Sequence, residues 1–155
     1  METKSRSRLK YNGFTLIESA LVLLVISLFV LVPTVMTSRL SSTLEVQGFL
    51  DRLEKNLATC QQTAIISNRR TSMLQDSRDN RNLAFQLAPG KWLETLQVPE
   101  ELTVSKVPEI VFAGGTGNAQ SYLQFHFIWE KKNQKITYRT LFGKGNIEKI
   151  VLPLT

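Results

Sequence analysis

The two side chains that most often do chemistry in proteins occur once each in this chain of 155 residues. Cys60 is the only cysteine and His126 the only histidine, so one copy of the chain can form neither a disulfide nor a His/Cys metal cluster. The acidic residues are scattered without the spacing of metal ligands. We therefore predict no catalytic residue, no metal site and no cofactor, and we expect that the protein is not an enzyme.

A glycine-rich segment at residues 114–117 (Gly-Gly-Thr-Gly) raises the question of a phosphate-binding loop. It lacks the lysine and the strand-to-helix context of such a loop, so we interpret it as a turn. His126 falls on the polar face of a predicted strand, which indicates a solvated or edge-packed side chain. Cys60 falls on the apolar stripe of a predicted helix, where a cysteine packs as a small apolar residue.

Basic side chains are the remaining candidates for binding. The formal net charge is +6, but half of it comes from residues 1–13, where four cations stand against Glu2. From residue 65 onward, 12 Lys and Arg stand against 8 Asp and Glu. Loop arginines could contact the phosphates of DNA, or they could be plain solvated surface charge, and the sequence leaves both interpretations open. The candidates for DNA contact are Arg69, Arg70, Arg78 and Arg81.

The element that must position the N-terminal residues is an apolar helix. The 20 residues from Ser19 to Ser38 contain no charged side chain, and a helix of about 20 mostly apolar residues is long enough to cross a membrane. Cations precede this stretch, and only Arg39 follows it directly. Because cations are enriched on the cytoplasmic side of membrane segments, we expect a single-pass protein with residues 1–13 in the cytoplasm.

Glu18 is the one charged residue in the apolar block of residues 14–36. An ionised carboxylate inside a membrane segment costs about 2.5–3.5 kcal/mol on insertion scales. A cut between Gly13 and Phe14 would create an α-amino group one helical turn away, and the positive end of the helix dipole also favours a carboxylate in the first turn. The alternative interpretation leaves the chain uncut and places Glu18 at the level of the lipid headgroups.

The rest of the chain has the pattern of a soluble domain. From residue 40, apolar residues recur at steps of three to five, which predicts that the helix continues to about residue 66. Beyond it, alternating apolar residues predict strands at 72–75, 82–87, 102–107, 109–113, 122–129, 135–142 and 147–152. The predicted fold class is α+β: a long N-terminal helix, half membrane-spanning and half amphipathic, packed on a C-terminal antiparallel β-sheet domain.

The run Gly13-Phe14-Thr15-Leu16-Ile17-Glu18, between a basic leader and an apolar helix, resembles the N-terminal signal of type IV pilins and type II secretion pseudopilins. The resemblance implies cleavage after Gly13 by a prepilin peptidase and N-methylation of Phe14. It also implies that Glu18 pairs with the N-terminus of a neighbouring subunit during assembly. The expected segments are a cleaved leader (1–13), a transmembrane and filament-core helix (14–38), an amphipathic helix half (39–66) and a β-rich globular domain (67–155).

A second, shorter resemblance concerns the end of the helix. Residues 60–73, Cys-Gln-Gln-Thr-Ala-Ile-Ile-Ser-Asn-Arg-Arg-Thr-Ser-Met, resemble the helix-to-strand junction of ComGD-type minor pseudopilins of Gram-positive competence systems and of the GspH/FimT-like branch of minor pilins. The resemblance implies a subunit of a surface pilus that is needed for DNA uptake in natural transformation. Its implied partners are other pilin-like subunits, the prepilin peptidase, the membrane and, by direct contact or through other subunits, DNA.

Other functions stay open at this point. The same N-terminal signal would serve a type II secretion pseudopilin or a subunit of another type IV filament. A signal-anchored extracytoplasmic binding protein that never assembles is a third possibility, from a different class. An ordinary secretory signal cleaved near residues 37–39 is a further alternative, although the apolar core is long for one and no Ala-x-Ala-like site follows it.

Overall fold

The structure is a computed structural model that describes residues 15–141 and 145–154, with residues 30–40 described in their backbone only. The chain divides into two compact units, Met1–Leu40 and Ser41–Thr155. In the first unit, the apolar side chains of residues 16–29 are exposed. Within the described residues, no helix is long and apolar enough to cross a membrane. The prediction of a membrane segment at 14–38 falls partly outside those residues.

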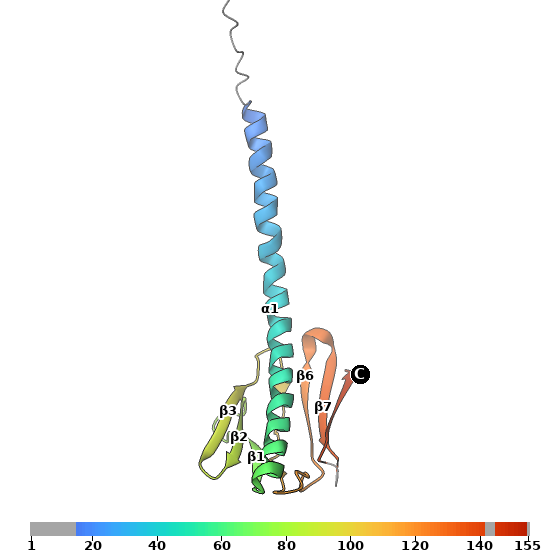
Figure 1. The fold of residues 1–155 in the computed structure, drawn as a ribbon. Coiled ribbons are helices and arrows are strands. Elements are labelled where there is room, and N and C mark those ends of the chain that lie inside the picture. Colours follow the sequence, from blue (N-terminus) through green and yellow to red (C-terminus); the bar gives the residue numbers. More distant parts are fainter. Residues whose placement is uncertain (1–14, 142–144, 155) are drawn as a thin grey trace, which may run out of the picture. The chain divides into compact units, whose positions relative to one another are not determined.

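Helix α1 runs from Leu16 to Ser67, close to the predicted limits (Figure 1). In the second unit, its residues 41–67 bury one stripe of side chains at helical spacing, namely Val46, Phe49, Leu50, Leu53, Leu57, Cys60 and Ala64. Leu44 belongs to the apolar residues that recur from residue 40 in the sequence, and it was expected on this stripe, but it is 57% exposed. Val46 takes the buried position instead, three residues before Phe49. The amphipathic continuation of the helix is therefore confirmed, with a small correction at its start.

The first sheet has four antiparallel strands in the order β3-β2-β1-β5. Its strands are β1 (Thr71–Gln75), β2 (Asn82–Ala88), β3 (Lys91–Gln97) and β5 (Ile110–Phe112). Cα pairing aligns Met73 with Phe85 and with Ile110, and all three side chains are buried. Their neighbours Ser72, Gln86 and Val111 pair with one another in the same way and form the opposite face.

The second sheet also has four antiparallel strands, in the order β4-β6-β7-β8. Its strands are β4 (Thr103–Val104), β6 (Gln124–Trp129), β7 (Gln134–Thr140) and β8 (Ile147–Pro153). A short 3₁₀ helix, η1 (Glu130–Lys132), joins β6 to β7. The alternation predicted for β6 is confirmed, because Phe125, Phe127 and Trp129 are buried and pair across to the buried face of β7.

One apolar core joins the helix to both sheets. Phe49 of α1 meets Phe127 edge to face, with ring centroids 5.4 Å apart, and Phe125 stacks on Tyr138 at 5.4 Å. The core contains residues from α1, from β1 and β2, and from β6 and β7. The predicted α+β fold, a long helix packed on antiparallel β-structure, is therefore confirmed for residues 41–141 and 145–154. The β-structure consists of two sheets rather than the single sheet that was expected.

Strand β3 was not predicted. Most of its residues are exposed, because it is the edge strand of the first sheet, so it has no apolar alternation to detect. The glycine-rich segment is a turn, as predicted, and it packs on the end of α1. A Cβ at Gly114 would lie 2.7 Å from the backbone carbonyl of Asn68, so only glycine allows this close approach.

Candidate functional site

The N-terminal processing residues can be placed only in part. Gly13 and Phe14, the predicted cleavage residues, lie outside the described residues. Helix α1 begins at Leu16, and Glu18 stands in its first turn with an exposed side chain. The backbone N–H of Glu18 donates to the carbonyl oxygen of Thr15 at 3.0 Å, which begins the helical hydrogen bonding. The Glu18 carboxylate therefore lies where the helix dipole favours a negative charge.

Arg69 and Arg70 occupy the turn between α1 and β1, and both are exposed. They line one side of a groove of about 440 Å³, whose other walls are Ser72, Gln86, Pro89 and Glu109. The Arg70 guanidinium lies 3.9 Å from the Glu109 carboxylate, and both side chains are more than half exposed. An ion pair at such distance and exposure contributes little to stability. Both guanidinium groups are therefore accessible to an anion in solvent.

Arg78 and Arg81 lie beyond the other end of β1. Five residues of strand, about 17 Å in length, separate them from Arg69 and Arg70. Arg78 is exposed, and its backbone N–H donates to the Asp76 carboxylate at 2.9 Å. Arg81 is half-buried, and its guanidinium donates to the backbone carbonyls of three residues before β4, namely Val98, Pro99 and Leu102. The four predicted arginines thus form two separate groups, and Arg81 is engaged within the fold.

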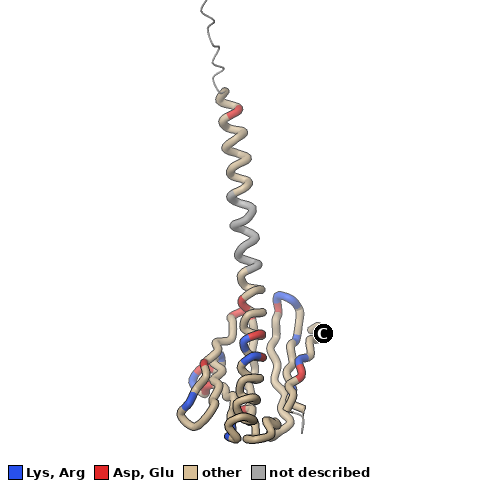
Figure 2. The backbone as a smooth tube through the Cα atoms, viewed as in Figure 1, with Lys and Arg blue, Asp and Glu red and all other residues tan. Residues whose placement is uncertain are grey.

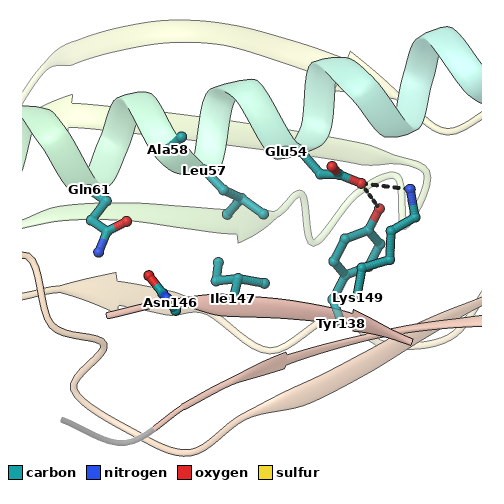
Figure 3. A pocket seen from close by; sticks show the side chains of 8 residues that line it. All are labelled: Glu54, Leu57, Ala58, Gln61, Tyr138, Asn146, Ile147 and Lys149. Carbon is teal, nitrogen blue, oxygen red and sulfur yellow. Dashed lines mark hydrogen bonds and ion pairs between the residues drawn. The ribbon is translucent and has the colours of Figure 1, made fainter. Parts of the chain in front are cut away.

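A cavity of about 220 Å³ lies between α1 and the β7–β8 hairpin (Figure 3). At one end, the Glu54 carboxylate accepts a hydrogen bond of 2.8 Å from the Tyr138 hydroxyl and an ion pair of 2.7 Å from the Lys149 ammonium. The remaining walls are largely apolar or amide side chains, from Leu57, Ala58, Gln61, Asn146 and Ile147. Sequence analysis missed this cluster, because nothing in the sequence relates residues 54, 138 and 149.

The electrostatics of this cavity suit a structural contact. Burial raises the pKa of Tyr138, and the hydrogen bond to Glu54 raises it further, so the phenol keeps its proton at neutral pH. Lys149 and Glu54 neutralise each other. The described residues that line the cavity include no Ser, Thr, Cys or His. The cluster therefore joins the helix to two strands of the second sheet.

His126 and Cys60 lie apart from each other and from the cavity. His126 is on the outer face of β6, opposite Thr137, where burial and the nearby Lys135 lower its pKa, so it is neutral at pH 7. Cys60 is fully buried, and burial raises the pKa of its thiol to about 11. A thiol of this kind is inert, because the thiolate is the reactive form. Within the described ranges, no three His, Cys, Asp or Glu side chains are placed to hold a metal ion.

Two further surfaces were not foreseen from the sequence. On one side of α1, the carboxylates of Glu45, Glu100 and Glu101 line an acidic groove of about 310 Å³. On the β6–β7 side, Lys131 reaches the helix, where its ammonium lies 2.7 Å from the Ser42 hydroxyl. The acidic groove and the contact of Lys131 with the helix join residues far apart in the chain, whereas the lysines at 131, 132 and 135 are a local basic turn already visible in the sequence.

Comparisons with known proteins assign no family. No protein-family model matches the chain, and no curated protein and no solved structure matches it either. The observed fold, a long N-terminal helix whose second half packs on antiparallel sheets, is compatible with a pilin-like fold. Any functional conclusion therefore depends on the N-terminal motif, the junction after the helix and the geometry described above.

Proposed function

We propose that this chain is a minor pseudopilin, a non-catalytic subunit of a competence pilus that is needed for DNA uptake in natural transformation. The observation that carries the proposal is the position of Glu18, in the first turn of a helix that begins two residues after Phe14. A carboxylate four residues after a newly formed α-amino group is what the assembly chemistry of pilin-like subunits requires. The motif around Gly13 and the α+β fold are in accord with it.

In this proposal the chain has two successive states. The prepilin is a single-pass membrane protein with its N-terminus in the cytoplasm, held by residues 14–38. The prepilin peptidase removes residues 1–13, and the new N-terminal Phe14 is methylated. The mature helix then enters the filament core, where Glu18 pairs with the α-amino group of a neighbouring subunit. The β-rich domain is carried to the cell surface in the assembled pilus.

The groove beside Arg69 and Arg70 is our candidate for direct DNA contact. Both guanidinium groups are exposed, and the weak ion pair between Arg70 and Glu109 can be exchanged for a phosphate at little cost. Arg78 is exposed but distant, so it could contact a second phosphate only on a longer stretch of duplex. We leave Arg81 out of the proposed interface, because its guanidinium is held by backbone carbonyls.

Two alternatives share part of this evidence. A type II secretion pseudopilin, or a subunit of another type IV filament, would need the same Glu18 and the same helix. The feature that favours competence is the junction at residues 60–73, with its exposed arginines directly after the helix. A signal-anchored binding protein would need neither the cleavage before Phe14 nor the carboxylate at residue 18.

The experiment that tests the proposal is deletion of the gene in its own host, followed by complementation. We expect transformation to be lost in the deletion strain and restored by the wild-type chain, while protein secretion is unchanged. Loss of secretion with normal transformation would instead assign the chain to a type II secretion system. No defect in either process, together with an uncut N-terminus, would favour the anchored binding protein.

A further inference from the structure

We propose that the β6–β7 hairpin binds anionic lipid headgroups while the subunit is still anchored in the membrane. The headgroups are those on the external face of the membrane that holds the anchor. This inference depends on the membrane segment in the proposed function. The site is the basic hairpin, which we define as residues 129–135, Trp-Glu-Lys-Lys-Asn-Gln-Lys. Its ligand class is the phosphate of an anionic lipid, and its role is to fix the orientation of the β-rich domain on the membrane before assembly.

The hairpin presents its charges at a tight and well-defined turn. Lys131 and Lys132 belong to η1, and both are exposed. Asn133 closes the turn in the left-handed conformation, with φ 51°, and its backbone N–H donates to the carbonyl of Glu130 at 2.9 Å. Figure 2 shows the resulting blue tip between β6 and β7. With Lys135, three ammonium groups stand against the single carboxylate of Glu130.

The position of the hairpin along the helix connects it to the membrane. The Lys131 ammonium lies 2.7 Å from the hydroxyl of Ser42. Only three residues lie between Ser42 and Ser38, where the uncharged stretch ends, so these two residues cannot lie more than about 14 Å apart in any conformation. The polar headgroup zone extends about 5–8 Å beyond the hydrocarbon on each side. The extended side chains of these lysines can therefore reach headgroup phosphates.

Trp129 gives an observation that is independent of the charges. Its side chain is 3% exposed, and its indole N–H has no hydrogen-bond partner among the described residues. The Lys132 ammonium lies over the indole ring, 4.3 Å from its centroid. Trp and Lys are typical neighbours at membrane interfaces, because the indole ring lies at the level of the headgroups and the lysine extends its ammonium toward water. A phosphate that draws Lys132 outward would break this cation–π contact and change the surroundings of the indole.

The acidic groove explains why this contact would orient the domain. Glu45 lies on α1 only three residues after Ser42, and it shares the groove with Glu100 and Glu101. An anionic surface attracts the hairpin and repels this groove. The two surfaces together therefore favour a tilt of the domain that brings the lysines toward the membrane and turns the carboxylates away from it. A neighbouring subunit could also bind these surfaces, because a basic protein surface would bind the groove and an acidic one would bind the hairpin. Such a subunit is therefore the partner that competes with the lipid.

The test uses the full chain in a Trp92→Phe background, so that Trp129 is the only tryptophan. The chain is reconstituted in vesicles of phosphatidylcholine, with or without phosphatidylglycerol, that carry a spin-label quencher on the headgroup. We expect stronger quenching of Trp129 when phosphatidylglycerol is present, and loss of the difference at high salt. Each lysine near an anionic surface changes occupancy by about fivefold, so Lys131→Glu with Lys132→Glu should abolish the difference.

The matched control is Arg69→Glu with Arg70→Glu, which changes the net charge equally and should leave the quenching unchanged. Equal quenching of the Trp92→Phe chain with and without phosphatidylglycerol would overturn the inference. A phosphatidylglycerol-dependent difference that persists in the lysine double variant would overturn it too. Lysine variants that keep the quenching but lose co-assembly with other pilin-like subunits would identify the hairpin as a protein interface instead. If the chain does not stay in the vesicles after an alkaline wash, the proposed membrane segment itself is wrong.

Discussion

Tyr138 on β7 donates a hydrogen bond of 2.8 Å to the carboxylate of Glu54 on α1, across 84 positions of sequence. The same carboxylate oxygen accepts from Lys149 on β8. Tyr138 is 1% exposed, and its ring stacks on Phe125 in the core. This contact therefore joins the helix to the second sheet at a point where the tyrosine is buried while the Glu54 carboxylate stays partly exposed.

Replacing Tyr138 with Phe tests the value of this contact. The ring and its packing are kept, and the hydrogen bond is lost, so we expect the free energy of unfolding to fall by about 1 kcal/mol. Tyr122 is 56% exposed and provides the control, because Tyr122→Phe should change the free energy by less than about 0.5 kcal/mol. Chemical denaturation of both full-length variants measures the difference. Equal effects would show that the Glu54 contact contributes nothing specific.

The thiol of Cys60 predicts a pH dependence of stability. Burial raises its pKa from 9.0 to about 11, so the unfolded chain loses this proton at a lower pH than the folded chain. The contribution of the protonated thiol to the free energy of unfolding is complete below pH 9.0 and is lost as pH rises toward 11. Its slope is at most about 1.4 kcal/mol per pH unit. Denaturation of wild type and Cys60→Ala over this range should show the steeper fall in the wild type, whereas parallel curves would contradict the buried, protonated thiol.

How much of the fold was predictable depends on whether a residue's partners are local. The stripe from Phe49 to Ala64 and the alternation in β6 are periodic, and both were predicted from the sequence. Strand β3 was missed because an exposed edge strand needs no apolar period. The division into two sheets was missed because strand pairing depends on long-range register, such as Met73 with Ile110, which leaves no local pattern.

The candidate sites divide in the same way. Glu18 could be proposed from the sequence because its carboxylate interrupts an apolar run, and its role stays a prediction. Arg69 and Arg70 were predictable as turn residues after the helix. Arg81 also lies in a loop and looked equivalent to them in the sequence, yet its guanidinium donates to backbone carbonyls before β4. Composition cannot distinguish an exposed arginine from one that is bound within the fold. The lysines of the basic hairpin form a turn that the sequence shows, but the acidic groove and the approach of the hairpin to α1 near Ser42 depend on distant elements, so only the structure could suggest these two features.

The arginine groove predicts salt-dependent DNA binding. Arg69→Glu with Arg70→Glu should weaken binding of duplex DNA and lower the slope of log affinity against log salt by about 2, because two phosphate contacts are lost. Lys131→Glu with Lys132→Glu makes the same change in net charge at a different surface and should leave the slope as it is. Titration of duplex DNA with both variants and the wild type at several salt concentrations measures these slopes. Equal loss in the two variants would mean that net charge, rather than this groove, attracts DNA.

Glu18 predicts a separation between processing and assembly. Glu18→Ala leaves the residues on both sides of the predicted cut unchanged, so we expect normal removal of residues 1–13. It removes the carboxylate that pairs with the α-amino group of a neighbour, so we expect the subunit to stay in the membrane fraction. The amount of subunit in sheared surface filaments measures this, with Thr15→Ala as a control at the same helix end. Normal incorporation of Glu18→Ala would contradict the proposed pairing.

The central claim is that residues 1–13 are removed and that the mature chain begins with a methylated phenylalanine. Mass spectrometry of the protein purified from its own host tests this directly. We expect an N-terminal peptide that begins at Phe14 and carries one added methyl group on its amino terminus. A mature chain that begins at Met1, or near Arg39, would contradict it.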